Sequence, residues 1–412
     1  MLSQAVILCG GLGTRLGDLT KVTPKPMLSV AGHPFLDVLI QEAARFGFRD
    51  IVLLAGRFGD QIRARYDGQD MYNAHIRVLV ERAPLGTGGA LRFALDVLAP
   101  TFLLMNGDSW IDADLTSFAA DWVKGAARIP EAAAQLLLQT VPDAGRFGIV
   151  ETVGGRAIAL HEKAASSVGQ PGRINAGVYV LRRDIVQSLP ADVAVSLETD
   201  ILPDLAKSGR VLAVQAPDGS YFIDIGVPES YARAQIELPR VRCRPALFLD
   251  RDGTLNADAG YTHRVEDLRW MPGAREAVAL ANRAGHYVFV VTNQAGVARG
   301  HYSEDAILTF HGAMQAQLFE LGAHIDGLEW CPCHPEGVIE RYRKLCPRRK
   351  PGGGMLMDVM RAWPIDRARS VMIGDKACDT QAAAAAGIKG VRYQGGALDA
   401  LVAQTIGFGD AR

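Results

Sequence analysis

Short apolar runs that are typical of buried strands alternate along the chain with stretches of helical periodicity. In the first half, strand-like runs lie at 5–9, 51–55 and 102–106, and helical patterns lie between them, for instance at 35–46 and 89–98. Strand–helix alternation predicts a mostly parallel sheet that is covered by helices on both faces. The pattern therefore indicates an α/β protein.

A short segment at 239–245 interrupts this alternation. It carries two prolines and three arginines, and a new buried strand follows it at 246–250. A chain of 412 residues is also too long for a single hydrophobic core. We therefore expect two domains, at 1–238 and 246–412, joined by a linker at 239–245.

Composition narrows the class of protein further. The net charge of -1 excludes the basic footprint of a nucleic-acid-binding protein. The sequence begins without a secretory signal, no apolar run reaches the roughly 18 residues of a membrane span, and its cysteines are typical of cytosolic thiols. We expect a cytoplasmic protein without nucleic-acid or membrane partners, in which a few placed arginines and lysines hold anionic ligands.

A glycine-rich turn follows the first strand-like run. Its residues are Gly10, Gly11, Gly13, Thr14 and Arg15. Backbone N–H groups exposed at such a turn bind phosphate, and Arg15 together with Lys25 of a Pro-Lys-Pro segment adds positive charge against a triphosphate. Taken alone, the pattern is equally consistent with a plain tight turn, and its glycine order does not match a dinucleotide-binding fingerprint.

Three further features of the first half favour a nucleotide. A second glycine loop holds Gly86 and Gly88, and Asp108 and Asp224 each end a strand-like run, where ligands bind in open α/β sheets. A single aspartate at such a place is most often a helix cap. Two of them, together with two phosphate-type loops, indicate a magnesium site for a nucleotide.

These motifs resemble the sugar-nucleotide pyrophosphorylases, which are nucleotidyltransferases with a GT-A-like fold, over about residues 1–238. The resemblance implies that Arg15 and the first loop hold the triphosphate, that Lys25 helps to activate the α-phosphorus, and that Gly86 and Gly88 touch the base. It assigns magnesium to Asp108 and Asp224, and the sugar to Glu162, Lys163 and Asn175. The implied reaction displaces pyrophosphate from a nucleoside triphosphate by a sugar 1-phosphate, with no protein nucleophile.

The second half carries its own set of polar residues at strand ends. Asp250 and Asp252 can converge in the turn after a buried strand, one to attack phosphorus and the other to protonate the leaving oxygen. Taken alone, this D-x-D-G-T pattern is also consistent with a metal loop or a turn. A hydroxyl, a lysine and an acidic pair follow at similar places, namely Thr292, Lys350, Asp375 and Asp379.

This set resembles the haloacid-dehalogenase superfamily over about 246–405, with a Rossmannoid fold and a minimal cap. Within it, the segments 249–256, 292–300 and 331–335 are similar to the small histidinol-phosphate and heptose-bisphosphate phosphatases. The resemblance implies that Asp250 is the nucleophile and Asp252 the acid/base. It also assigns the phosphoryl group to Thr292, Asn293 and Lys350, magnesium to Asp250, Asp252 and Asp375, and a second substrate phosphate to Arg349.

A group of cysteines precedes that lysine, and it comprises Cys331, Cys333 and Cys346. Relatives hold a structural zinc through Cys-x-His and Cys-x-Cys, but here Cys333 stands at the histidine position and Arg348 at that of the last cysteine. Structural zinc takes four ligands, and His334 is the remaining candidate. A zinc site and an ordered loop with leftover thiols are both consistent with the sequence.

The two resemblances together narrow the substrate, because a bisphosphate phosphatase leaves the sugar 1-phosphate that a pyrophosphorylase consumes. The segments 9–16, 84–90 and 221–229 are similar to the heptose 1-phosphate guanylyltransferases, and the His-x-x-His-type motif of the ADP-heptose route is missing from the sequence. The resemblance implies two steps toward GDP-D-glycero-D-manno-heptose, through an α-anomeric 1-phosphate.

Two alternatives remain. The first is a hexose or amino-sugar 1-phosphate uridylyl-, thymidylyl- or guanylyltransferase fused to a histidinol-phosphate-like phosphatase. The second is that one half is a non-catalytic regulatory module, although both halves carry all the catalytic residues that the resemblances imply. The sequence does not set the oligomeric state.

Overall fold

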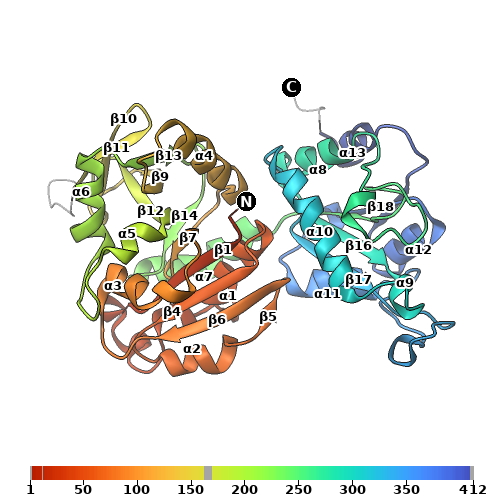
Figure 1. The fold of residues 1–412 in the computed structure, drawn as a ribbon, viewed down its shortest axis with the longest axis horizontal. Coiled ribbons are helices and arrows are strands. Elements are labelled where there is room, and N and C mark those ends of the chain that lie inside the picture. Colours follow the sequence, from red (N-terminus) through yellow and green to blue (C-terminus); the bar gives the residue numbers. More distant parts are fainter. Residues whose placement is uncertain (1, 12, 162–168, 409–412) are drawn as a thin grey trace. The chain divides into compact units, whose positions relative to one another are not determined.

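The computed structural model describes residues 2–11, 13–161 and 169–408. The chain divides into two compact units between Pro239 and Arg240, and each unit is described by itself (Figure 1). Among the described residues, no helix is both long enough and apolar enough to cross a membrane.

The division between the units falls inside helix α7 (Pro228–Arg242), although Pro239 lies within it. The segment predicted as a linker, 239–245, is therefore helical as far as Arg242, which the prediction missed. Leu238 of this helix is buried, and the carbonyl of Arg242, its last residue, accepts a hydrogen bond of 2.8 Å from the hydroxyl of Tyr287.

Ten of the described strands of the first unit form one sheet, in the order β10-β11-β13-β9-β12-β7-β1-β4-β6-β5. β1 pairs in parallel with β4 and β7, whereas β12 runs antiparallel between β7 and β9. The prediction of a mostly parallel sheet therefore holds for β7, β1, β4 and β6, but it is wrong for most of the remaining pairings, which are antiparallel except for that of β9 with β13. The strands are β1 (Gln4–Cys9), β4 (Asp50–Ala55), β5 (Asp70–Met71), β6 (Ala74–Val80), β7 (Thr101–Asn106), β9 (Ala134–Val141), β10 (Ile149–Val153), β11 (Arg156–His161), β12 (Gly172–Arg182) and β13 (Val211–Gln215).

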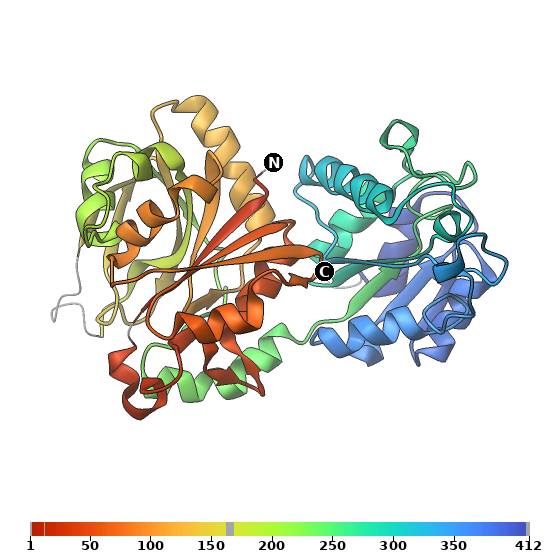
Figure 2. The ribbon, with the colours of Figure 1, turned by 60° about the horizontal axis from the view of Figure 1, so that its bottom comes forward.

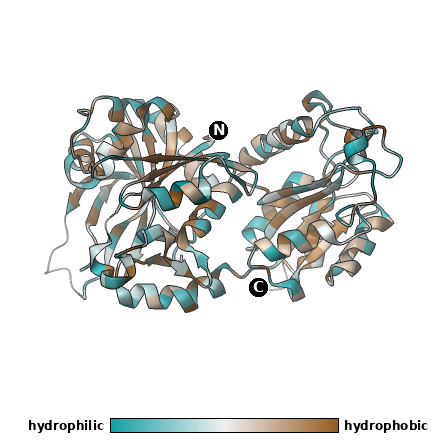
Figure 3. Cartoon of the chain, turned by 90° about the horizontal axis from the view of Figure 1, so that it is seen from below, coloured by the Kyte–Doolittle hydropathy of each residue, from teal (hydrophilic) through white to brown (hydrophobic). Residues whose placement is uncertain are grey.

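Helices cover this sheet because its strands are apolar on both faces, as Figure 3 shows by their brown colour. On one face, Val6 and Leu104 share a buried cluster with Leu91, Val186 and Leu205 of three helices. Those helices are α3 (Gly86–Phe93), α5 (Arg183–Gln187) and α6 (Leu202–Lys207). The unit also contains α1 (Phe35–Arg45), α2 (Gly59–Tyr66), α4 (Leu115–Arg128), and the paired strands β8 (Ser109–Ile111) and β14 (Phe222–Asp224).

In the second unit, the described residues form a parallel five-stranded sheet in the order β17-β16-β15-β18-β19. These strands are β15 (Ala246–Leu249), β16 (Tyr287–Asn293), β17 (Gly327–Cys331), β18 (Val371–Gly374) and β19 (Lys389–Arg392). The carboxyl ends of the central strands lie at one edge of the sheet, which brings together the residues that follow them.

Helices lie on both faces of this second sheet, as Figure 2 shows. One group, in which the members pack on one another, consists of α8 (Ala274–Arg283), α10 (Glu304–Phe319) and α13 (Leu398–Ile406). The other group consists of α11 (Gly354–Ala362) and α12 (Ala377–Ala385), and the short helix α9 (Ala295–Ala298) follows β16. This layered arrangement is the predicted α/β fold of the second half.

Candidate active sites

A buried lysine joins two carboxylates beside the sheet of the first unit. Lys25 Nζ lies 2.5 Å from Asp108 Oδ2 and 3.9 Å from Asp224 Oδ1. Gly226 leaves room for this cluster, because a Cβ atom there would lie 2.8 Å from Lys25 Nζ and 3.4 Å from Arg15 Nη2. The structure thus brings together the two predicted magnesium ligands and the two predicted phosphate-binding cations. Carboxylate oxygens are the ligands that Mg²⁺ prefers, so the residues fit that ion.

Each of the two glycine loops of the first unit contains a glycine in the left-handed conformation, Gly13 in the first and Gly86 in the second. Gly13 adopts the left-handed conformation, with φ 65°, at the start of the turn that carries Arg15. In the second loop, the N–H groups of Gly88 and Gly89 donate to the carbonyl of Val195, at 2.9 and 3.2 Å. These two groups are not free to bind a phosphate, so the prediction of a second phosphate-type loop is wrong for them.

An open cavity of about 610 Å³ lies beside β12. Asn175 lines it as predicted, together with Tyr179 and Glu198, which the sequence analysis missed. Asn175 donates to the hydroxyl of Tyr179 at 2.8 Å, and Glu198 accepts from that hydroxyl at 3.3 Å and from the hydroxyl of Thr87 at 2.6 Å. The wall offers polar groups to a hydroxylated ligand. The other two predicted sugar ligands, Glu162 and Lys163, lie outside the described residues.

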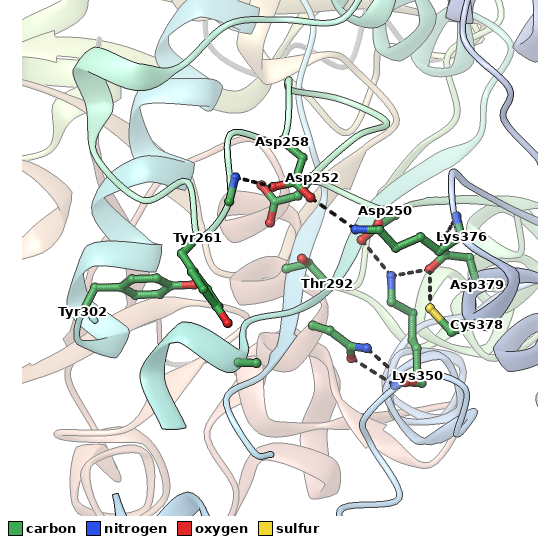
Figure 4. A pocket seen from close by; sticks show the side chains of 13 residues that line it. Asp250, Asp252, Asp258, Tyr261, Thr292, Tyr302, Lys350, Lys376, Cys378 and Asp379 are labelled. Carbon is green, nitrogen blue, oxygen red and sulfur yellow. Dashed lines mark hydrogen bonds and ion pairs between the residues drawn. The ribbon is translucent and has the colours of Figure 1, made fainter. Parts of the chain in front are cut away.

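In the second unit, the buried ammonium group of Lys350 contacts the segment after β15, the strand β16 and the helix α12 (Figure 4). Lys350 Nζ lies 2.7 Å from Asp250 Oδ1 and 2.7 Å from Asp379 Oδ1, and it donates to the carbonyl of Val291 at 2.7 Å. Burial alone would lower the pKa of Lys350, but the charges of Asp250 and Asp379 have the larger effect, so the pKa of Lys350 is raised. The lysine is therefore held charged against the predicted nucleophile.

Asp375 forms a cluster with Asp250 and Asp379, in which one oxygen of each lies within 4.8 Å of the others. Burial raises the pKa of Asp375 to about 6; Lys376 opposes this, and repulsion from the other two carboxylates adds to it. Its Oδ1 atom is buried and has no hydrogen-bond partner among the described residues. A magnesium ion fits this cluster, because it would satisfy that oxygen and offset the repulsion. Gly253 leaves the space, since a Cβ atom there would lie 2.5 Å from Asp375 Oδ2.

The predicted acid/base, Asp252, is held by four hydrogen bonds. Arg251 donates to Oδ1 through Nε at 3.0 Å and to Oδ2 through Nη2 at 2.9 Å. Asn256 donates to Oδ1 at 3.1 Å, and Gln294 donates to Oδ2 at 2.8 Å. The sequence pattern located Asp252 but none of its three partners, since arginine, asparagine and glutamine near a motif carry no distinctive spacing.

An open pocket of about 240 Å³ brings most of the predicted residues of the second unit to one place. The predicted residues that line it are Asp250, Asp252, Thr292, Asn293, Lys350 and Asp379, and the missed ones include Tyr261, Tyr302 and Lys376. Figure 4 shows Tyr261 and Tyr302 beside each other on one side of the pocket. Arg349 is not among the lining residues, and its Nη1 atom donates to the carbonyl of Cys333 at 3.2 Å.

Three sulfur atoms lie within 4.8 Å of one another, those of Cys331, Cys333 and Cys346. His334 does not join this cluster, and its Nδ1 atom accepts a hydrogen bond of 3.1 Å from the N–H of Glu336. At the remaining ligand position, Arg348 forms ion pairs with Glu329 and, at 3.2 Å, with Asp358. Among the described residues the site has three ligands rather than four, so they do not fit a structural zinc ion.

Comparison with protein families separates the two halves in the same way. The nucleotidyl transferase family matches residues 4–240, and the HAD-hydrolase-like family matches residues 347–407. The D-glycero-beta-D-manno-heptose-1,7-bisphosphate 7-phosphatase of Rhodopseudomonas palustris is 49% identical over 163 residues, which cover 40% of this chain and 91% of that protein. The phosphatase of the same name from Vibrio cholerae is 40% identical over 172 residues, which cover 40% of this chain and 92% of that protein.

A solved structure resembles the other half. HddC from Yersinia pseudotuberculosis matches with 30% sequence identity and a TM-score of 0.50, over 57% of this chain and 100% of that chain. Together with the two clusters of carboxylates and lysine, these likenesses identify an enzyme with nucleotidyltransferase and phosphatase activities. The chain belongs to the nucleotidyl transferase family through its first unit and to the HAD-like family of these phosphatases through its second unit.

Proposed function

We propose that the chain catalyses two consecutive steps in the biosynthesis of GDP-D-glycero-D-manno-heptose. The second unit removes the 7-phosphate of heptose 1,7-bisphosphate, and the first unit joins the resulting heptose 1-phosphate to GTP with release of pyrophosphate. One observation carries this proposal: a unit similar to named heptose-bisphosphate phosphatases, almost over their whole length, shares a chain with a unit similar to HddC. We place the reaction in the cytoplasm.

In the phosphatase step, Asp250 is the nucleophile. One of its carboxylate oxygens forms a bond to the phosphorus of the 7-phosphate while the bond from phosphorus to the sugar oxygen breaks, and Asp252 gives a proton to that oxygen. Water then attacks the aspartyl phosphate, its proton passes to Asp252, and inorganic phosphate leaves. Lys350, held 2.7 Å from Asp250, supports the step by balancing the charge of the phosphoryl group.

We place a magnesium ion at each of the two carboxylate clusters. In the second unit, Asp250, Asp375 and the backbone carbonyl of Asp252 hold it. In the first unit, Asp108 and Asp224 hold it. When bound, the ion supplies positive charge against the phosphoryl oxygens.

In the transferase step, the first unit positions two substrates. Arg15 and Lys25 hold the phosphates of GTP beside Asp108 and Asp224, which is supported by their convergence around Gly226. The cavity lined by Asn175, Tyr179 and Glu198 receives the sugar, since its wall offers hydrogen-bond partners for hydroxyl groups. Attack on the α-phosphorus then follows from proximity and charge neutralisation.

The anomer of the sugar separates two versions of this proposal. The names of the two phosphatases above specify the beta anomer of their bisphosphate, whereas the GDP route implied by the sequence motifs uses an α-anomeric 1-phosphate. Assays of phosphate release with both anomers of heptose 1,7-bisphosphate test this point. We expect the α anomer to be the better substrate, and a strong preference for the β anomer would contradict the GDP route.

A panel of substrates tests the alternative that the fusion serves another sugar. The first unit is assayed with GTP, UTP, dTTP and ATP against heptose, hexose and amino-sugar 1-phosphates, and the second with histidinol phosphate beside the heptose bisphosphate. We expect GTP with heptose 1-phosphate to give the highest kcat/KM. A higher value for UTP or dTTP with a hexose 1-phosphate would establish the alternative.

A further inference from the structure

Gln294 lies directly after β16 and links two residues of the phosphatase pocket. Its side-chain Nε2 donates to Asp252 Oδ2 at 2.8 Å and to the hydroxyl oxygen of Thr292 at 2.9 Å. Its Oε1 atom accepts from the hydroxyl of Tyr302 at 2.6 Å and from Nη2 of Arg251 at 3.2 Å. The side chain is 1% exposed, and these four bonds use every donor and acceptor position of the amide.

The partners of Gln294 fix the direction of each bond. A carboxylate such as Asp252 only accepts and a guanidinium such as Arg251 only donates, so the amide cannot be flipped. The hydroxyl oxygen of Thr292 therefore accepts from Nε2, and its own proton points elsewhere. In the described part of the chain Thr292 donates no side-chain hydrogen bond, and it lines the pocket, so this proton is left for a ligand.

The Oε1 atom of Gln294 contacts Arg251, whose side chain is held in the interior of the unit. Arg251 is 1% exposed, its guanidinium lies 4.7 Å from the ring centre of Phe310, and its Nη2 atom also donates to the carbonyl of Thr262 at 2.6 Å. Because Nη2 has two hydrogens for three acceptors, it shares one of them with Oε1 of Gln294, to which the hydroxyl of Tyr302 is the closer donor. A chain of directed hydrogen bonds runs from Arg251 through Gln294 to Thr292, and successive bonds of such a chain strengthen one another.

We propose that Gln294 is a positioning residue of the phosphatase, which turns the hydroxyl proton of Thr292 toward a phosphoryl oxygen and holds the carboxylate of Asp252. The inference rests on the proposed aspartyl-phosphate reaction. A phosphoryl group presents only acceptor oxygens at neutral pH, so a hydroxyl that offers its proton binds it, and one that offers a lone pair repels it.

The variant Gln294→Glu tests the direction of the hydrogen bond to Thr292, because glutamate has almost the same shape as glutamine. An oxygen replaces the donating Nε2, so the hydroxyl of Thr292 turns its proton toward Glu and away from the pocket, and a second carboxylate lies against Asp252. We expect kcat/KM for heptose 1,7-bisphosphate to fall roughly ten- to hundredfold, the size of a lost charge-assisted contact. Inhibition by inorganic phosphate should weaken as well.

Gln315→Glu is the matched control. Gln315 is another buried amide, 7% exposed and located in α10, with Nε2 donating to the carbonyl of Ile325 at 2.9 Å and Oε1 accepting from its N–H at 2.8 Å. It is not among the residues that line the pocket. This control should lower the melting temperature of the second unit at least as much as Gln294→Glu, while kcat/KM changes less than about threefold, since no pocket contact is lost.

A double-mutant cycle with Thr292→Val separates positioning from a general loss of structure. If Gln294 acts through the hydroxyl of Thr292, the fold loss of kcat/KM caused by Gln294→Glu should be at least about threefold smaller in the Thr292→Val chain than in the wild-type chain. Additive losses, or equal losses of kcat/KM in Gln294→Glu and Gln315→Glu, would overturn the proposal. If Gln294→Glu melts below the assay temperature, Gln294→Met, which also lacks the donor, takes its place in the cycle.

Comparison of the wild-type chain with Asp250→Asn keeps the two proposals apart, because an inactive wild type would refute the phosphatase function itself.

Discussion

Lys350 and Asp379 form a buried ion pair, with Nζ of the lysine 2.7 Å from Oδ1 of the aspartate and side chains that are 1% and 0% exposed. The same ammonium group lies 2.7 Å from Asp250. Asp379 therefore fixes the lysine that balances the charge at the proposed nucleophile, although it is not expected to touch the phosphoryl group itself.

Asp379→Asn should destabilise the second unit and slow phosphate release. The substitution removes one of the two carboxylates that balance Lys350. Leaving a buried charge without any partner costs about 3–5 kcal/mol of folding free energy, so we expect a smaller loss here, because Asp250 still pairs with the lysine. Thermal unfolding and phosphate release measure the two effects. Asp267→Asn is the control, since its ion pair with Arg264 is exposed and should contribute little. Unchanged melting in both variants would show that the buried pair does not hold the site.

The two reactions should be separable by single substitutions. Asp250→Asn should abolish phosphate release and leave the transferase active when heptose 1-phosphate is supplied, because the residue lies only in the second cluster. Asp108→Asn should do the reverse, since its carboxylate pairs with Lys25 in the first unit. Pyrophosphate and phosphate are measured in parallel for each variant. Loss of both activities from either change would contradict two independent sites.

The cysteine cluster should gain a metal when its missing ligand is restored. We expect the purified wild-type chain to hold no stoichiometric zinc and Arg348→Cys to bind about one zinc ion per chain, because a fourth thiol completes the tetrahedral set. Arg348→Ser is the control that breaks the ion pairs with Glu329 and Asp358 without adding a ligand. Elemental analysis gives the answer. About one zinc ion per chain in all three proteins would show that three thiols suffice.

Arg349→Ala should discriminate between substrates of the phosphatase. Its guanidinium is half-buried next to Lys350, and the resemblance to the heptose enzymes assigns it to the second phosphate. Losing a charge-assisted contact costs about 1.5–3 kcal/mol, or roughly ten- to hundredfold in kcat/KM for the bisphosphate. The loss for a simple monophosphate ester should be small. Equal losses for both substrates would assign Arg349 to the loop that carries Cys333, whose carbonyl it contacts.

The elements that the sequence predicted well are those with continuous apolar runs. The runs at 5–9 and 51–55 are found as β1 (Gln4–Cys9) and β4 (Asp50–Ala55), and the helix expected at 35–46 is α1 (Phe35–Arg45). Burial of a strand on both faces leaves a clear local signature. The antiparallel pairing of β12 between β7 and β9 has no such signature, because strand direction depends on the path of the chain between the strands.

The residues of the candidate site divide in the same way, into those that a local motif predicts and those that no local pattern predicts. Asp250 and Asp252 stand in a local motif, and residues at strand ends could be expected to meet at one edge of the sheet. The hydrogen bonds of Gln294 to Asp252 and Arg251 could not be predicted, since they join segments far apart in the sequence. The ion pairs of Arg348 could not be predicted either, because charged side chains carry no spacing that identifies their partners. Gly86 and Gly88 pack closely against Val195, which is a structural reason for glycine at both positions; their contact with the base stays a prediction.

The central claim is that one chain takes heptose 1,7-bisphosphate to GDP-heptose. The direct measurement incubates the full chain with heptose 1,7-bisphosphate, GTP and Mg²⁺ and follows phosphate, pyrophosphate and sugar nucleotide. We predict that inorganic phosphate appears first, that pyrophosphate and GDP-heptose follow in equal amounts, and that Asp250→Asn forms neither phosphate nor GDP-heptose. Release of phosphate without any GDP-heptose, or GDP-heptose formed equally well by Asp250→Asn, would contradict the account.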